Sequence, residues 1–188
     1  MDLSLIDLWL PILAGAGFVF IASCVMHMAL PWHKNDFGKL PNEDSVLAGL
    51  RDANLPRGCY RFPHATSMAD FKEPAMLQKF EDGPVGLMTI LPTGMPKMGG
   101  ALFTWFLYSL LVAAVAGYVA SMTLNGDSDG MLVLRVTSAI AVLAHATSNM
   151  MNSIWKGEPW SISAKFAVDG LIYGMLTGAA FMWFWPAG

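Results

Sequence analysis

Charged residues are scarce in this chain. Only 13 % of its 188 residues are Asp, Glu, Lys or Arg, about half of what soluble domains carry, whereas 55 % are hydrophobic. This balance excludes a disordered chain and an ordinary soluble domain. The net charge of −3 gives no reason to expect nucleic acid as a partner. There are only two cysteines, Cys24 in an apolar run and Cys59 in a charged segment, so we expect no disulfide framework.

Motifs that carry soluble-enzyme chemistry are also missing. The sequence has no G-x-x-x-x-G-K-[ST] or G-x-G-x-x-G phosphate loop, no CxxC pair, no CxxCH and no HExxH. Ser, His and Asp residues exist, but no nucleophile elbow frames them. These absences disfavour an ordinary soluble-type enzyme, and we predict no catalytic residue.

Long apolar runs are what the chain does contain. A hydrocarbon core of ~30 Å takes about 20 helical residues, a length that the runs at 8–30, 102–124, 131–151 and 164–185 match. They predict an all-α membrane protein with four transmembrane helices. Residues 21–24 resemble a lipoprotein cleavage box, but no Lys or Arg precedes them, so we expect the first helix to be retained.

A water-exposed insert separates the first and second runs. Residues 31–100 hold eight of the eleven basic residues, and eight acids balance them. Helix-start, strand and turn signals predict helices at 41–50 and 74–82 and strands at 59–62 and 85–91. The chain therefore divides into a tail with the first helix (1–30), a small α+β insert (31–100) and helices two to four (101–188). The insert is too short for a large core, so we expect it to lean on the membrane helices or on a partner.

Basic residues mark cytoplasmic loops, which predicts a cytoplasmic insert and both termini outside. The turn at 125–130 is acidic and agrees with that orientation. Tryptophans test the four spans independently, because indole side chains anchor helices at membrane interfaces. All seven fall at or just beyond predicted helix ends and are interpreted as interfacial anchors: Trp9, Trp32, Trp105, Trp155, Trp160, Trp183 and Trp185.

The third apolar run carries a polar stripe. With Val142 between them, its members recur at steps of three and four, which places them on one helix face: Arg135, Ser138, His145, Asn149 and Asn152. Arg135 lies near the outer end and can snorkel toward headgroups. Asp169, in the fourth run, is expected at a depth similar to that of His145. Intramembrane ionisable groups need partners, so a His145–Asp169 contact is a hypothesis, either as a proton-linked or ligand-binding pair or as a hydrogen bond that fixes the hairpin.

Two further patterns lie in the predicted helices. Gly170, Gly174 and Gly178 form a doubled small-xxx-small pattern, which favours close packing of a helix or of a second subunit. Cys24, His27 and Met28 share a face of the first helix, and their side chains suit Cu(I) or a haem axial position. Ordinary packing is the competing interpretation of this second group. The histidines of the insert, His33 and His64, could complete a metal site, but nothing in the sequence places them near His27.

The chain also resembles a known group of proteins. The resemblance lies in residues 32–36 with 40–44, in 60–64, in 81–86 and in 153–160. It is to bacterial four-span membrane proteins of about this length that carry no assigned activity. The resemblance implies a bacterial inner-membrane setting and provides no catalytic or binding residues.

These observations leave three functional hypotheses open. The first is an accessory or structural subunit of a larger membrane complex, or a self-associating helix bundle, with the lipid bilayer and other subunits or itself as partners. The second is transport of protons, ions or small solutes with His145 and Asp169 as the titrating pair. The third is a membrane redox protein or enzyme that binds metal, haem or quinone near His27 or His145.

Overall fold

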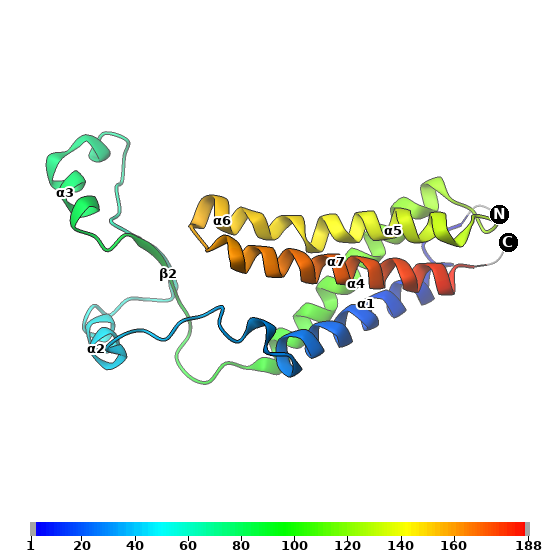
Figure 1. Ribbon diagram of the computed structural model, residues 1–188, viewed down its shortest axis with the longest axis horizontal. Coiled ribbons are helices and arrows are strands. Elements are labelled where there is room, and N and C mark those ends of the chain that lie inside the picture. Colours follow the sequence, from blue (N-terminus) through cyan, green and yellow to red (C-terminus); the bar gives the residue numbers. More distant parts are fainter. Residues whose placement is uncertain (1–2, 187–188) are drawn as a thin grey trace. The chain divides into compact units, whose positions relative to one another are not determined.

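The computed structural model describes residues 3–186, and four of its helices are long and apolar enough to cross a membrane (Figure 1). These candidate spans are Trp9–Ala29, Met98–Thr123, Gly130–Lys156 and Trp160–Phe184. A two-stranded sheet lies in the sequence between the first two. The predicted fold class is therefore confirmed. By contacts the chain forms two units, one from the part up to Phe37 together with the part from Lys97 onward, and one from Gly38–Pro96.

The membrane unit is built almost entirely of helix. Two of its spans are interrupted, because the first ends in a π-helical turn and the third contains a short 3-10 turn. The elements are α1 (Trp9–Cys24), the π-helical turn (Val25–Ala29), a 3-10 turn (Pro31–His33), α4 (Met98–Thr123), α5 (Gly130–His145), a 3-10 turn (Thr147–Asn149), α6 (Met150–Lys156) and α7 (Trp160–Phe184).

The four long helices form a closed ring. α7 packs against both α5 and α1, α1 packs against α4, and α4 completes the ring by packing against α5. Near the start of α1 the core is an apolar cluster that includes Ile12, Val133 and Phe181. Toward the end of α1 the core becomes more polar and aromatic, with Tyr173 buried and Trp105 beside it. The two halves of the bundle interior thus differ in character.

The three glycines of α7 form its seam with α5. A Cβ atom at Gly170 would overlap the backbone of Ala146, one at Gly174 would overlap Val142, and one at Gly178 would overlap Ser138. Small residues let helix backbones approach closely where lipid provides no hydrophobic drive. Of the two neighbours that the sequence left open, the third span of the same chain occupies this face.

The connection between the last two spans is shorter than expected. The sequence predicts a loop over 152–163, whereas α6 continues to Lys156 and α7 already starts at Trp160. Gly157 ends α6 with a φ of +70°, a left-handed conformation that glycine adopts without strain. Pro159, with a φ of −54°, directly precedes α7. Only Gly157–Pro159 is therefore left to connect the two helices.

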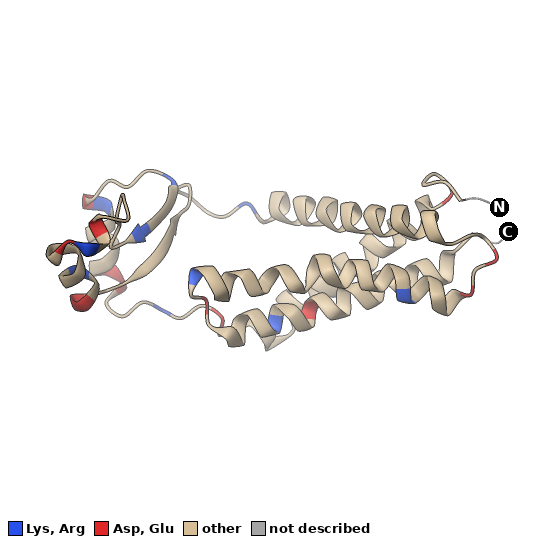
Figure 2. Ribbon diagram, turned by 90° about the horizontal axis from the view of Figure 1, so that it is seen from above, with Lys and Arg blue, Asp and Glu red and all other residues tan. Residues whose placement is uncertain are grey.

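The insert unit contains two helices and a two-stranded antiparallel sheet, as predicted. Its elements are α2 (Glu43–Asp52), β1 (Gly58–Phe62), a 3-10 turn (Asp70–Lys72), α3 (Pro74–Asp82) and β2 (Gly86–Ile90). Tyr60 pairs with Met88 in the middle of the sheet. No described residue between 38 and 96 is fully buried, because a single two-stranded sheet can cover only one of its faces. Charged residues gather in this unit and are nearly absent from the four spans (Figure 2).

Candidate functional site

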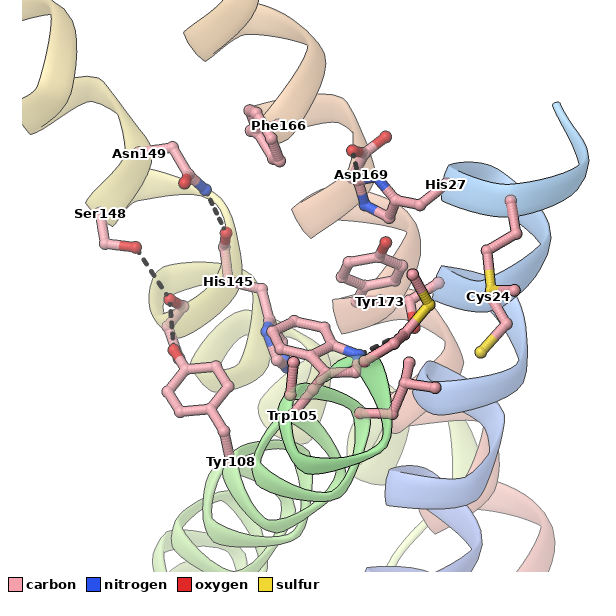
Figure 3. A pocket seen from close by; sticks show the side chains of 16 residues that line it. Cys24, His27, Trp105, Tyr108, His145, Ser148, Asn149, Phe166, Asp169 and Tyr173 are labelled. Carbon is pink, nitrogen blue, oxygen red and sulfur yellow. Dashed lines mark hydrogen bonds and ion pairs between the residues drawn. The ribbon is translucent and has the colours of Figure 1, made fainter. Parts of the chain in front are cut away.

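A cavity of about 600 Å³ lies between α1, α4, α5 and α7 (Figure 3). Its wall is mostly apolar and aromatic, with contributions from Trp105, Tyr108 and Phe166. Met28 and Met98 line its rim and are 65 % and 60 % exposed. The volume falls within the roughly 300–1,000 Å³ that small-molecule sites occupy. The cavity is therefore large enough for a small organic ligand.

His145, at the end of α5, is the main polar group on the α5 side of this cavity. It is only 5 % exposed, and neither of its ring nitrogens has a hydrogen-bond partner. Three aromatic rings surround the imidazole edge-on, with centroids 5.5 Å away for Tyr108, 5.7 Å for Tyr173 and 5.8 Å for Trp105. A neutral imidazole carries one donor and one acceptor, so two hydrogen-bonding positions are open here.

Two groups on α7 add further unpaired polar atoms to the cavity. The Tyr173 hydroxyl is buried without a partner, and so is Oδ1 of Asp169, a residue only 1 % exposed. Asp169 lies about 13 Å along α7 from Trp160, deeper than the sequence suggested because the helix starts earlier. Trp105, in contrast, is satisfied, since its indole donates to Ser23 Oγ at 2.8 Å. The unpaired groups are thus concentrated on α5 and α7.

The partner of Asp169 is His33, not His145. The chain after α1 turns back over the bundle, and His33 Nε2 lies 2.7 Å from Asp169 Oδ2. The other ring nitrogen, Nδ1, lies 2.5 Å from Asp36 Oδ2. The His27 ring stacks on His33 at a centroid distance of 4.2 Å, and its Nε2 is 3.8 Å from Asp169 Oδ2. The hypothesis of a His145–Asp169 hydrogen bond is therefore wrong for this structure, although both residues line one cavity.

Asp36 links His33 to Lys165 of α7. Its carboxylate also accepts a hydrogen bond from Lys165 Nζ at 2.5 Å, and its side chain is 3 % exposed. Burial alone would raise the pKa of Asp36, but the hydrogen bonds from Lys165 and His33 outweigh burial and hold the pKa below its usual range. Asp36 therefore stays ionised and ties residues 31–37 to α7.

The polar stripe of the third span is divided among different environments. Arg135 is exposed, Ser138 packs on Gly178, and only His145 faces the cavity fully buried. Asn149 lines the cavity from the 3-10 turn and donates to the His145 carbonyl at 2.7 Å. Asn152 lies beyond the cavity in α6. The stripe is therefore not one continuous polar path.

The metal-ligand candidates of the first helix line the cavity, whereas most of the tryptophans lie outside it. Cys24, His27 and Met28 all line the cavity, so the structure brings this group to the site. Trp9, Trp32, Trp155, Trp160 and Trp183 are exposed, and Trp185 donates to the Asn125 carbonyl. Trp105 differs, because its ring points inward and forms part of the cavity wall.

Sequence reasoning missed several residues of this site, among them Asp36, Tyr108, Lys165 and Phe166. It also left His33 without a neighbour. Phe166 lies under both histidines, with centroids 5.9 Å from His27 and 4.9 Å from His33. The one available signal was composition, since Trp32, His33 and Asp36 follow the first apolar run within seven residues of its end. Nothing local indicates that this segment turns back toward α7.

Comparison of the chain with family models, curated proteins and solved structures finds no match. The resemblance to bacterial four-span proteins therefore stays a prediction, and the functional argument rests on the site itself.

Proposed function

We propose that this multi-pass membrane protein binds a lipid-soluble molecule with a planar, hydrogen-bonding head group, and that a quinone or quinol is the class that fits best. One observation carries the proposal. His145 is buried in a cavity of about 600 Å³ with both ring nitrogens unpaired. A buried polar group without a partner costs about 1–3 kcal/mol, so a ligand that supplies the partner is favoured.

The chemistry of the wall supports this class. A quinone carbonyl accepts hydrogen bonds, and a quinol hydroxyl both donates and accepts them. His145 can donate or accept, and the Tyr173 hydroxyl can donate. The indole and phenol rings around His145 offer flat apolar surfaces to a ring, as binding sites for aromatic ligands do. A cavity between membrane helices is also a place that a lipid-soluble molecule can reach.

Transport through the bundle receives less support. The cavity lies in the half of the bundle near the end of α1, and the other half is filled by apolar side chains such as Ile12, Val133 and Phe181. Thr137 and Thr177 in that region donate to carbonyls of their own helices. An ion would therefore meet a packed apolar core beyond His145.

One of the arguments for an accessory subunit no longer holds. The glycine face, which the sequence offered to a partner, is covered by α5 of the same chain. The expectation of partner subunits or self-association now rests on the insert, which has no fully buried residue of its own. The bacterial inner membrane as the location stays a prediction from the resemblance.

The test is to purify the protein in mild detergent, extract bound lipids for mass spectrometry, and titrate a short-chain quinone while following tryptophan fluorescence. We expect a quinone in the extract and saturable quenching. Tyr173→Phe removes only one hydroxyl and should weaken binding about threefold to tenfold, the range for one hydrogen bond.

Tyr118→Phe is the matched control, because Tyr118 lies on α4 and is 51 % exposed outside the cavity. It should bind as the unmodified protein does. Equal affinities for the unmodified protein and for His145→Ala, or no saturable quenching at all, would contradict the proposal.

A further inference from the structure

Three potential metal ligands converge beside the cavity. His27 lies in the π-helical turn after α1, His33 in the following 3-10 turn and Asp169 in α7. One ligand atom from each lies within 4.8 Å of the other two. They come from segments up to 142 positions apart in the chain, so folding has to assemble the group. Two imidazoles and one carboxylate form a set that suits Zn²⁺ and Fe²⁺.

The surroundings of His33 match those of a metal-bound histidine. Such a histidine usually donates its other ring N–H to a carboxylate, which fixes the ring and raises its basicity. Here His33 Nδ1 faces Asp36 at 2.5 Å, and Asp36 is held in turn by Lys165. This arrangement aims Nε2 at Asp169, and the stacked ring of His27 places its own Nε2 near the same carboxylate. The outer partner of the histidine is thus already in place.

The inner atoms are incompletely satisfied. Asp169 is 1 % exposed, and its Oδ1 has no partner. His27 Nε2 is 3.8 Å from Asp169 Oδ2, too far for a hydrogen bond. A neutral His33 has one N–H and cannot donate to Asp36 and Asp169 together. The 2.7 Å contact therefore needs either a proton, carried by one of the two residues, or a cation between Nε2 and Asp169.

We propose that His27, His33 and Asp169 bind one divalent transition-metal ion of the Zn²⁺ or Fe²⁺ type, with Asp36 and Lys165 as the outer support. Metal–ligand bonds of about 2.0–2.2 Å in a tetrahedral site place ligand atoms about 3.3 Å apart. The separations of 2.7 Å and 3.8 Å from Asp169 Oδ2 lie on either side of that value. The ligand atoms of His27 and His33 lie within 4.8 Å of each other, so these side chains move closer together when they share one ion. His27 and Asp169 also line the cavity, so the fourth position is available to water or to a ligand there.

The competing arrangement is a hydrogen-bond network without metal, in which a proton lies between His33 and Asp169. The variant His27→Ala distinguishes the metal site from the network without metal. His27 is a ligand in the metal site but forms no hydrogen bond with the Asp36–His33–Asp169 group. Removing a metal ligand abolishes tight binding. In the network, removing His27 leaves both hydrogen bonds of His33 intact.

The experiment uses the full-length protein in detergent, stripped with a chelator and titrated with Zn²⁺ by calorimetry. We expect one Zn²⁺ per chain and its loss in His27→Ala. Asp36→Asn should weaken Zn²⁺ binding by roughly 10- to 100-fold, as changes to an outer partner do. His64→Ala, at an exposed histidine of the insert, should bind as the unmodified protein does.

Thermal unfolding of each chelator-treated variant supplies the folding control, and His27→Gln serves as a second variant if His27→Ala is unstable. Failure of the unmodified protein to bind Zn²⁺ or Fe²⁺ stoichiometrically would overturn the metal site. The metal site would also be overturned if both His27 variants bound Zn²⁺ with the affinity of the unmodified protein. Quinone binding is measured separately through Tyr173, so either proposal can fail without the other.

Discussion

At the scale of single residues, His33 links two carboxylates of the membrane unit and, through one of them, a lysine of α7. Its two nitrogens face Asp36 and Asp169, and Asp36 binds Lys165. Asp169 and Lys165 are the two charged residues of α7, and both reach this one loop residue directly or through Asp36. The cost of charges within a membrane helix is thus reduced by a segment that follows a different helix.

This network predicts strong coupling between Lys165 and Asp36. Lys165→Met leaves the Asp36 carboxylate poorly compensated, so unfolding free energy should fall, by less than the ~3–5 kcal/mol found for fully buried pairs because Lys165 is 27 % exposed. The double variant with Asp36→Asn should be less unstable than the sum of the single variants. Unfolding in mixed detergent micelles with a chelator present measures all four proteins. Strictly additive effects would show that the pair contributes little.

His145 and Asp169 could be found from the sequence, because an ionisable residue stands out within an apolar run. His33, Asp36 and Lys165 could not. His33 and Asp36 stand in a charged segment and Lys165 at the edge of an apolar run, where each looks like a solvated residue. Their contacts span 129 to 136 positions in the two long-range cases. The partner of Asp169 was therefore sought on the neighbouring span, whereas it lies in the loop.

At the scale of elements, α7 packs against α5 with one face and lines the cavity with another. Its glycines lie against α5, and Phe166, Asp169 and Tyr173 face the cavity. Close packing on one face holds the other at a fixed distance from His145. The position of the cavity wall therefore depends on the seam.

A single added methyl group tests the seam. Gly174→Ala places a Cβ against Val142 and should destabilise the protein by about 1–3 kcal/mol, the usual cost of overpacking. Gly17→Ala in α1 is the matched control, because no atom lies within 4 Å of a Cβ built there. It should be neutral or slightly stabilising. Detergent unfolding of both variants measures the difference, and equal stability of the two would contradict the assigned packing.

The helices and strands could be predicted from local sequence signals, whereas the interruptions within the helices could not. Hydropathy identified all four spans, and turn residues located α3 and both strands. The π-helical turn at Val25–Ala29 contains no Gly or Pro that would have predicted it from the sequence. It arises where the chain leaves the bundle and turns back, so it reflects tertiary contacts that a single segment does not encode.

At the scale of the whole molecule, the two native cysteines can test the predicted orientation. Cys59 is exposed in β1, whereas Cys24 is partly buried in the first span. In a Cys24→Ser background, a membrane-impermeant maleimide should label Cys59 in inverted membrane vesicles and not in intact spheroplasts, because the insert is predicted to be cytoplasmic.

The control places the only cysteine on the opposite side. Asp127→Cys, in a chain without native cysteines, lies in the exposed acidic turn between α4 and α5 and should label in spheroplasts. Labelling of Cys59 from outside would reverse the predicted topology without changing the fold or the cavity.

The contact between His33 and Asp169 also sets conditions on how the protein is made. α7 is synthesised after the other three spans, and domains generally form in the order of synthesis. Asp169 is therefore synthesised after His33, which lies 136 positions earlier in the chain. Because an unpaired acid is costly in lipid, insertion of α7 is favoured next to an α1 whose following loop already offers His33. Loss of His33 should then impair biogenesis of the last span before it affects the finished protein.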